Sequence, residues 1–295
     1  MRGVSPVGGK HMLQIMRIRL TLVLLIIVTG IPQTSTAQTI SSEIGIVLMH
    51  GKGGSPAWYV STLASYLEEK EYLVANLEMP WSGRRDYHVS VNVAEREVES
   101  ALDTLRSKGA KKLFVAGHSQ GGLFALFLGG KHVVDGIVSI APGGDVSNST
   151  FREKLGASVE LARKLITEGK GDEKTRFYDY ENTKGMTPVI TTPTIYLSWF
   201  DPNGAMNQTM AVKAMSPRIP VLYIVPKGDY PGLRKVKESM FNALPGNPLS
   251  KLYEPDSSHV NAPSASRDEI VRWTTEVVHR ANPALQGTPA SLGRP

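Results

Sequence analysis

Short apolar segments alternate along the chain with longer segments of helical period. The apolar segments are rich in Val, Ile and Leu, which favours buried strands; they are Ile44–Met49, Tyr72–Leu77, Lys112–Ala116, Gly136–Ala141, Thr194–Trp199, Val221–Val225 and Leu252–Glu254. The segments with the helical period are Ala57–Lys70, Val93–Lys108, Gln120–Gly129, Asn207–Met215, Leu233–Leu244 and Arg267–Arg280. This alternation predicts an α/β fold with a mostly parallel central sheet and helices on both faces.

The segment from Gly143 to Pro193 interrupts the alternation. It is long and polar, with a helical pattern over Phe151–Glu168 and a charged tract at Lys170–Arg176. We interpret it as a helical insertion that caps the sheet, and a pair of ordinary surface helices is the alternative. The sequence thus predicts one domain over residues 38–282 with an insertion at about 143–193. Residues 283–295 contain Pro, Gly and Ser without periodicity, which predicts a flexible tail.

Residues 1–37 have the order of charges and apolar residues that is typical of a secretory signal peptide. Basic residues precede the apolar run Leu20–Val28, and the small residues Ser35–Ala37 follow it. The run is shorter than the roughly 20 residues that a membrane-spanning helix needs. We therefore expect cleavage after Ala37 and a periplasmic or secreted protein with no stable membrane span, and an uncleaved anchor is the alternative. Three methionines are candidate start residues: Met1, Met12 and Met16.

Composition and charge exclude several classes of function. The chain has no cysteine, which excludes thiol nucleophiles, cysteine zinc sites and iron–sulfur clusters. Its net charge is +6, but four of the 33 basic residues and none of the 27 acidic ones lie in residues 1–37. The remaining chain is nearly neutral, so we expect no nucleic-acid partner. Neither H-E-x-x-H nor G-x-G-x-x-G occurs, so we expect no metal and no cofactor.

A serine lies where a predicted strand passes directly into a predicted helix. The strand Lys112–Ala116 is followed by Gly117-His118-Ser119-Gln120-Gly121, which fits the pattern G-x-S-x-G. Such a turn needs neighbours without side chains, because the serine takes a strained backbone conformation. Gly117 and Gly121 meet this need, and Ser119 is therefore the predicted nucleophile.

With this strand, serine and helix, the chain resembles the α/β-hydrolase superfamily of serine esterases and lipases from about Ile44 to Ala281. The resemblance implies a catalytic triad in the chain order Ser, acid, His, and a small-molecule ester or acyl substrate.

A serine hydroxyl needs a base within hydrogen-bond reach, usually a histidine that a carboxylate orients. Of the seven histidines, His259 lies in the loop directly after the last predicted strand, and it is the predicted base. Asp229 follows the strand Val221–Val225, where the superfamily carries its acid. Asp201 is the alternative acid, because it follows the apolar run Thr194–Trp199. The order of the strands favours Asp229.

The first predicted strand ends in the glycine-rich turn His50-Gly51-Lys52-Gly53-Gly54. It resembles the oxyanion turn of the superfamily, which implies that the backbone N–H groups of Gln120 and Lys52 bind the oxyanion, with Gly53 as the alternative to Lys52. The turn lacks the pattern G-x-x-x-x-G-K-[ST] of a phosphate-binding loop.

Four residues are candidates for substrate binding, because they lie in the turn, in a loop or at a strand end that we expect at the carboxyl edge of the sheet: His50, Gly51, Trp81 and Trp199. Core packing is the alternative for both tryptophans.

The predicted function is hydrolysis of carboxylic esters through an acyl-enzyme. A triad does not choose its leaving group, so an amidase or peptidase, a thioesterase and a polyester depolymerase are alternatives. A non-catalytic binding protein of the same fold is a further alternative.

Overall fold

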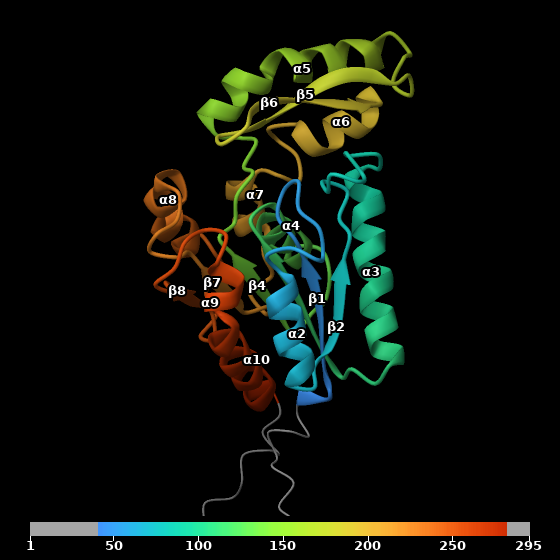
Figure 1. The fold of residues 1–295 in the computed structure, drawn as a ribbon. Coiled ribbons are helices and arrows are strands. Elements are labelled where there is room, and N and C mark those ends of the chain that lie inside the picture. The colour runs from blue at the N-terminus through green and yellow to red at the C-terminus, as the bar shows by residue number, and fades with distance from the viewer. Residues whose placement is uncertain (1–40, 282–295) are drawn as a thin grey trace, which may run out of the picture. The chain divides into compact units, whose positions relative to one another are not determined.

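The computed structural model describes residues 41–281, so the predicted signal peptide and tail lie outside the described residues. Within this range the chain forms a central sheet of six strands in the order β2-β1-β3-β4-β7-β8 (Figure 1). The strands are β1 (Ile44–Met49), β2 (Leu73–Leu77), β3 (Lys112–His118), β4 (Gly136–Ile140), β7 (Val221–Ile224) and β8 (Lys251–Tyr253). All neighbouring strands pair in parallel, which confirms the predicted sheet.

The parallel pairing places the loops that carry the predicted chemistry at one edge of the sheet. Among the described strands, β1 comes first in the sequence and pairs with β2 and β3, and the later strands β4, β7 and β8 follow outward from β3. The carboxyl ends of parallel strands share an edge, where open α/β sheets bind their ligands. The loops after β1, β3, β7 and β8 therefore meet there.

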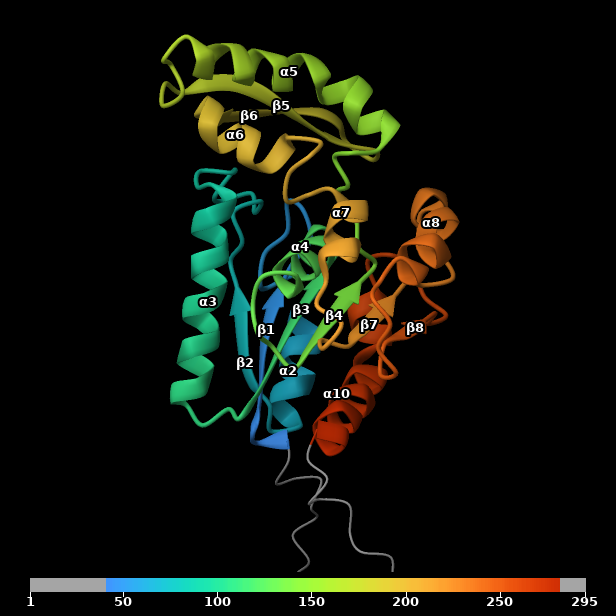
Figure 2. The same ribbon diagram turned by 180° about the vertical axis from the view of Figure 1, so that it is seen from behind.

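Helices cover both faces of the sheet (Figures 1 and 2). On one face lie α2 (Ser61–Glu69) and α10 (Arg267–Ala281), with the short α9 (Ala262–Ala265) beside α2. The other face carries α3 (Val91–Ser107), α4 (Gln120–Gly129), α7 (Gln208–Ala214) and α8 (Pro231–Asn242). Within residues 41–281, no helix combines the length and apolar character that crossing a bilayer requires.

Each strand divides its side chains between two cores. In β1, Ile44, Ile46 and Leu48 pack with the helices of one face, whereas Val47 and Met49 pack with those of the other. Both faces of the sheet are thus covered, which explains why its strands are apolar without a polar alternation.

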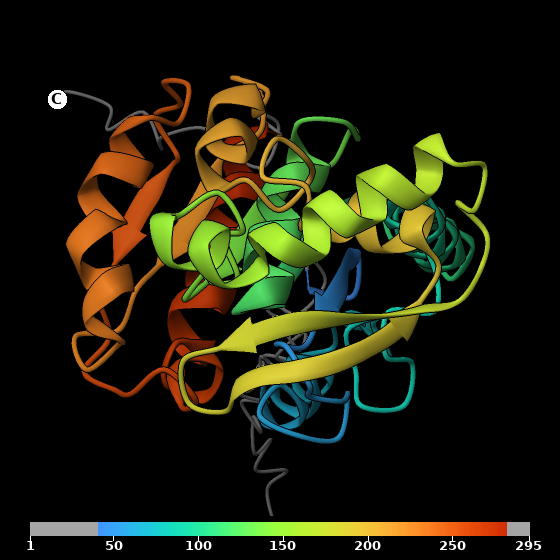
Figure 3. The same cartoon turned by 90° about the horizontal axis from the view of Figure 1, so that it is seen from above.

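Between β4 and β7 the chain leaves the sheet and forms a separate layer, which we call the cap. It contains α5 (Ser149–Thr167), an antiparallel hairpin of β5 (Thr175–Glu181) and β6 (Gly185–Thr191), and α6 (Pro193–Phe200). Both α6 and β5 contact α5, and Figure 3 shows the hairpin and α5 running alongside each other. The sequence predicted the helical pattern of α5 but not the hairpin, and the charged tract at 170–176 leads into β5.

The predicted strand at Thr194–Trp199 is wrong, because these residues form α6. The side chain of Thr192 accepts a hydrogen bond from the backbone N–H of Ile195, and Pro193 occupies the first turn. Both features start a helix. The run is almost wholly apolar because α6 is buried against α5 of the cap and against α3. Hydrophobicity alone does not separate such a helix from a buried strand.

Candidate active site

The serine turn has the strained backbone that its glycines predicted. Ser119 has φ 55° and ψ −116°, between the end of β3 and the start of α4. A Cβ atom on Gly117 would lie 2.1 Å from the carbonyl oxygen of Gly121, and one on Gly121 would lie 2.6 Å from that of Met49. Neither position accepts a side chain, so the turn can form only with glycine on both sides of the serine.

Two further glycines leave space around the Ser119 side chain. A Cβ on Gly51 would lie 3.0 Å from the Cβ of Ser119, and a Cβ on Gly143 would lie 3.4 Å from its Oγ. Ser119 is half-buried, and within residues 41–281 its hydroxyl makes no hydrogen bond, including none to His259. In unliganded sites such a bond is often long or absent until substrate arrives.

His259 and Asp229 form a hydrogen-bonded pair at the ends of β8 and β7. The distance from His259 Nδ1 to Asp229 Oδ1 is 2.7 Å, and the Asp229 residue is only 3% exposed. The backbone N–H of Tyr230 donates to the same oxygen at 2.7 Å. A carboxylate acceptor fixes the hydrogen on Nδ1 and leaves Nε2 of His259 free to take a proton.

His118, the residue before the serine, contacts the loop that carries the base. Its Nε2–H donates to the backbone oxygen of His259 at 2.9 Å, and the two rings lie 4.9 Å apart between centroids. Burial, and after it the nearby His259 ring, lowers the pKa of His118 to about 3. His118 is therefore a neutral donor that holds the His259 loop. The sequence reasoning missed this role, because the motif allows any residue here.

The glycine-rich turn after β1 leaves the Lys52 amide uncommitted. The N–H of Gly53, which has φ 65°, donates to the carbonyl oxygen of Trp81 at 2.8 Å. Within residues 41–281, the N–H groups of Lys52 and of Gln120, the first residue of α4, have no acceptor. Gly53 is thus engaged elsewhere, and the two amides named first in the sequence analysis are available.

His50 and Trp81 support this turn from the core. The Nε2 of His50 accepts from the backbone N–H of Met79 at 3.0 Å, so Nδ1 carries the hydrogen and donates to Gly51 O at 2.7 Å. Burial lowers the pKa of His50, which keeps this ring neutral. The indole N–H of Trp81 donates to His50 O at 2.8 Å, and both residues are 2% exposed. Their side chains pack beneath the turn instead of lining an open surface.

Trp199 and Asp201 belong to the cap. Trp199 is 1% exposed, and its indole N–H donates to Val89 O at 2.7 Å. Asp201 follows the end of α6 and pairs with Arg163 of α5 at 3.2 Å. The run before Asp201 is a helix, so Asp201 does not stand at the end of a sheet strand. The structure brings Asp229, and not Asp201, to His259.

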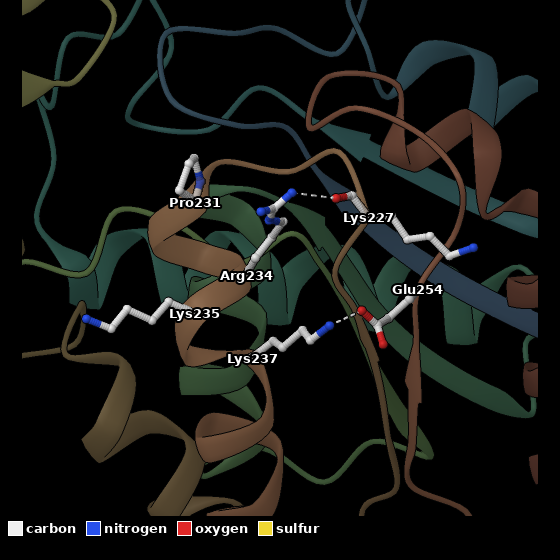
Figure 4. A pocket seen from close by; sticks show the side chains of 6 residues that line it. All are labelled: Lys227, Pro231, Arg234, Lys235, Lys237 and Glu254. Atoms are coloured by element: carbon white, nitrogen blue, oxygen red, sulfur yellow. Dashed lines mark hydrogen bonds and ion pairs between the residues drawn. The ribbon is translucent and has the colours of Figure 1, made fainter.

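A hollow of about 460 Å³ lies along α8 and is lined by Lys227, Pro231, Arg234, Lys235, Lys237 and Glu254 (Figure 4). Some of its charges are already paired, because Lys237 binds Glu254 and Arg234 donates to Lys227 O. None of these residues takes part in the contacts described above. In the described part of the chain, no three His, Asp or Glu side chains gather in a way that could hold a metal.

Comparison with known proteins identifies the family of the chain. A model of the alpha/beta hydrolase family matches residues 46–273. The chain therefore belongs to the alpha/beta hydrolase family, which confirms the resemblance.

Several solved structures share the fold. One of the metagenome-derived lipolytic enzymes LipS and LipT is 17% identical, with a TM-score of 0.54 over 81% of this chain and 94% of that one. The monoacylglycerol lipase of Paleococcus ferrophilus is 20% identical, with a TM-score of 0.54 over 79% and 94%. Est1E from Butyrivibrio proteoclasticus, solved with ferulic acid bound, is 13% identical, with a TM-score of 0.54 over 79% and 89%.

Proposed function

We propose that the protein is a serine hydrolase that cleaves carboxylic esters, with Ser119 as nucleophile, His259 as general base and Asp229 as the residue that orients His259. The observation that carries this proposal is that a strained serine and a hydrogen-bonded His–Asp pair lie at the same sheet edge, where His118, next to the serine, contacts the loop of His259. These groups come from three different strand ends, and acyl transfer needs all three.

In the first half-reaction, Ser119 Oγ attacks the carbonyl carbon of the ester, and its proton passes to Nε2 of His259. The negative charge that forms on the carbonyl oxygen is held by the backbone N–H groups of Lys52 and Gln120. Collapse of the tetrahedral intermediate breaks the bond to the alcohol oxygen, which takes the proton from His259. The acyl group remains on Ser119.

In the second half-reaction, a water molecule attacks the acyl carbon and gives its proton to Nε2 of His259. The tetrahedral intermediate collapses, the carboxylic acid leaves, and Ser119 recovers its proton. Asp229 stabilises the imidazolium in both halves through the hydrogen bond from Nδ1.

Ester chemistry is the preferred reaction because the solved structures named above are described as lipolytic enzymes, a monoacylglycerol lipase and a protein with a bound phenolic acid. These descriptions guide which substrates to test first, and they do not identify the substrate of this chain.

The test is labelling of the full-length chain by a fluorophosphonate, followed by hydrolysis assays. We expect labelling of the wild type and of Ser107→Ala, a control that changes an exposed serine at the end of α3, and none of Ser119→Ala. The assays compare p-nitrophenyl esters of rising acyl length with aminoacyl anilides, acyl thioesters and a polyester film. Faster hydrolysis of the simple esters is the expected result.

Other outcomes assign the other functions. An exclusive preference for anilides, thioesters or polyester would replace the esterase proposal with the corresponding hydrolase. A folded wild type that neither reacts with the probe nor hydrolyses any substrate would indicate a binding protein.

A further inference from the structure

A buried carboxylate in the cap contacts the turn that carries the proposed oxyanion hole. Asp179 lies in β5 and is 3% exposed. Its Oδ1 accepts from Lys52 Nζ at 2.7 Å and from the backbone N–H of Tyr180 at 2.6 Å. A buried charge is tolerated only when it is paired and hydrogen-bonded. The Lys52 ammonium is the partner that permits Asp179 at this position.

The second oxygen of Asp179 is linked through Tyr87 to Gln120, the other residue whose backbone N–H forms the proposed oxyanion hole. The Tyr87 hydroxyl lies 3.1 Å from Asp179 Oδ2 and 3.2 Å from Nε2 of Gln120. A phenol has one hydrogen, and the carboxylate is the stronger acceptor, so Tyr87 donates to Asp179 and accepts from Gln120. Burial and the charge of Asp179 raise the pKa of Tyr87, which keeps it a donor.

The backbone at Tyr87 is strained. Asp86 and Tyr87 have φ values of 42° and 53°, a region that residues with a Cβ adopt only at a cost in free energy. The hydroxyl of Thr191, at the end of β6, donates to Tyr87 O at 2.9 Å and helps to hold this conformation. Such strain persists where surrounding contacts impose a particular placement, and here it directs Tyr87 toward Asp179 and Gln120.

One carboxylate thus fixes the side chains of both residues whose amides form the proposed oxyanion hole. Lys52 depends on this contact more strongly, because its neighbours Gly51, Gly53 and Gly54 have no side chains that could hold the turn against the cap. Its Nζ makes a second contact with the cap, to Tyr180 O at 3.2 Å. Gln120 depends on the contact with Asp179 less, because α4 begins at Gln120 and the helix already fixes the direction of its backbone N–H.

We propose that Asp179 is a positioning residue for the oxyanion hole, an inference that rests on the proposed function. Its carboxylate, carried by the cap, holds the Lys52 turn and the Gln120 side chain so that their backbone N–H groups point at the developing oxyanion. The cap then completes the catalytic geometry as well as covering the sheet edge.

The test measures kcat and KM for p-nitrophenyl acetate in full-length wild type, Asp179→Asn, Lys52→Met and Tyr87→Phe, below the unfolding temperature of each. Tyr196→Phe is the matched control, because the buried Tyr196 hydroxyl donates to Tyr178 O in the cap at 2.7 Å and touches neither amide residue. Inhibition by phenylboronic acid, which forms a tetrahedral adduct with an active serine, is measured in parallel.

Removal of one oxyanion donor costs about 10²- to 10³-fold in kcat. We expect a loss of about 10- to 100-fold for Asp179→Asn and Lys52→Met, because the donor is misplaced and not deleted. The loss for Tyr87→Phe should be smaller, and KM should change little. The Ki of phenylboronic acid should rise by the same factor as kcat falls. Tyr196→Phe should lower the unfolding temperature but leave kcat within about twofold.

Wild-type kcat and Ki in Asp179→Asn would overturn the inference while leaving the proposed function intact. A fall in kcat for Tyr196→Phe as large as that for Tyr87→Phe would also overturn it, because the effect would then come from cap stability. If Asp179→Asn does not fold, the comparison of kcat between Tyr87→Phe and Tyr196→Phe still tests the inference. A wild type that is inert toward both the ester and a fluorophosphonate would remove the proposed function itself.

Discussion

The sheet edge and the cap hold the candidate site in different ways. At the sheet edge, placement comes from the backbone: Ser119 sits in a strained turn that Gly117 and Gly121 alone permit. The cap is held by side chains, through the Lys52–Asp179 ion pair and the hydrogen bond from Trp199 to Val89. It also has an aromatic stack of its own, in which Tyr196 lies 4.4 Å from both Phe177 and Phe200 between ring centroids.

This difference indicates which substitutions damage folding and which damage function alone. A side chain added at the serine turn collides with backbone atoms, which cannot move without distorting β3 and α4. A side chain removed from the contacts between the cap and the sheet edge creates no collision with the backbone and changes mainly how the two layers meet. Substitutions in the two regions should therefore separate stability from activity.

The largest effect is expected at the pair on the sheet edge. We expect His259→Ala to lower kcat for an ester by about 10⁶-fold, because the base is lost, and Asp229→Asn to lower it by about 10⁴-fold, because the base is wrongly oriented. Asp201→Asn, which removes a carboxylate of the cap, should stay close to wild type. Steady-state kinetics on the three variants checks this. A larger loss in Asp201→Asn than in Asp229→Asn would contradict the assignment of the acid.

Gly117→Ala should test the backbone basis of the serine turn. The new Cβ would lie 2.1 Å from Gly121 O, and we expect a loss of at least about 3 kcal/mol in the free energy of unfolding. Urea denaturation measures the change. An alanine variant with unchanged stability would show that the turn relaxes easily and that the contrast with the cap is false.

Acid should destabilise the protein through His118. Its pKa is about 3 in the folded chain and 6.5 in the reference state, so between these values the unfolded chain binds a proton that the folded chain does not. Stability is present above pH 6.5 and falls as the pH drops toward 3, by at most about 1.4 kcal/mol per pH unit. Urea denaturation at several pH values should show that the free energy of unfolding falls less steeply with decreasing pH in His118→Gln than in the wild type. Equal slopes would argue against a neutral, buried His118.

The smallest effect is expected in the cap. Gly156 lies within α5, and a Cβ there would meet no atom within 4 Å. Gly156→Ala should stabilise the protein by about 0.5–1 kcal/mol, because alanine loses less backbone entropy in a helix. Thermal unfolding of Gly156→Ala and of Gly117→Ala compares the effect of the same substitution on stability in the two regions. Destabilisation by both would mean that the cap is packed as tightly as the sheet edge.

The sheet could be predicted from the sequence because its strands are apolar runs separated by helices of regular period. The placement of Ser119 and His259 at the sheet edge could be predicted for a related reason, since each lies in the short segment that follows such a run. The sequence left the acid open because it took Thr194–Trp199 for a strand, which placed Asp201 at an apparent strand end. The largely apolar composition of α6 hides its helical period.

The cap hairpin and its contacts could not be predicted from local pattern. The strand β5 contains Arg176, Asp179 and Glu181, which do not alternate as an amphipathic strand would. A buried Asp179 is reasonable only beside Lys52, a residue 127 positions away in the chain. Such a pairing exists only in the folded chain, which is why the sequence named Lys52 for its amide and missed its side chain.

The most direct test of the central claim is to trap the acyl-enzyme. Full-length protein is mixed with p-nitrophenyl acetate, quenched rapidly in acid, digested and examined by mass spectrometry. The account predicts an acetyl group on Ser119, in an amount equal to the burst of p-nitrophenol, and neither signal in Ser119→Ala. Ester hydrolysis that persists in Ser119→Ala, or an acetyl group on a different residue of the active protein, would contradict it.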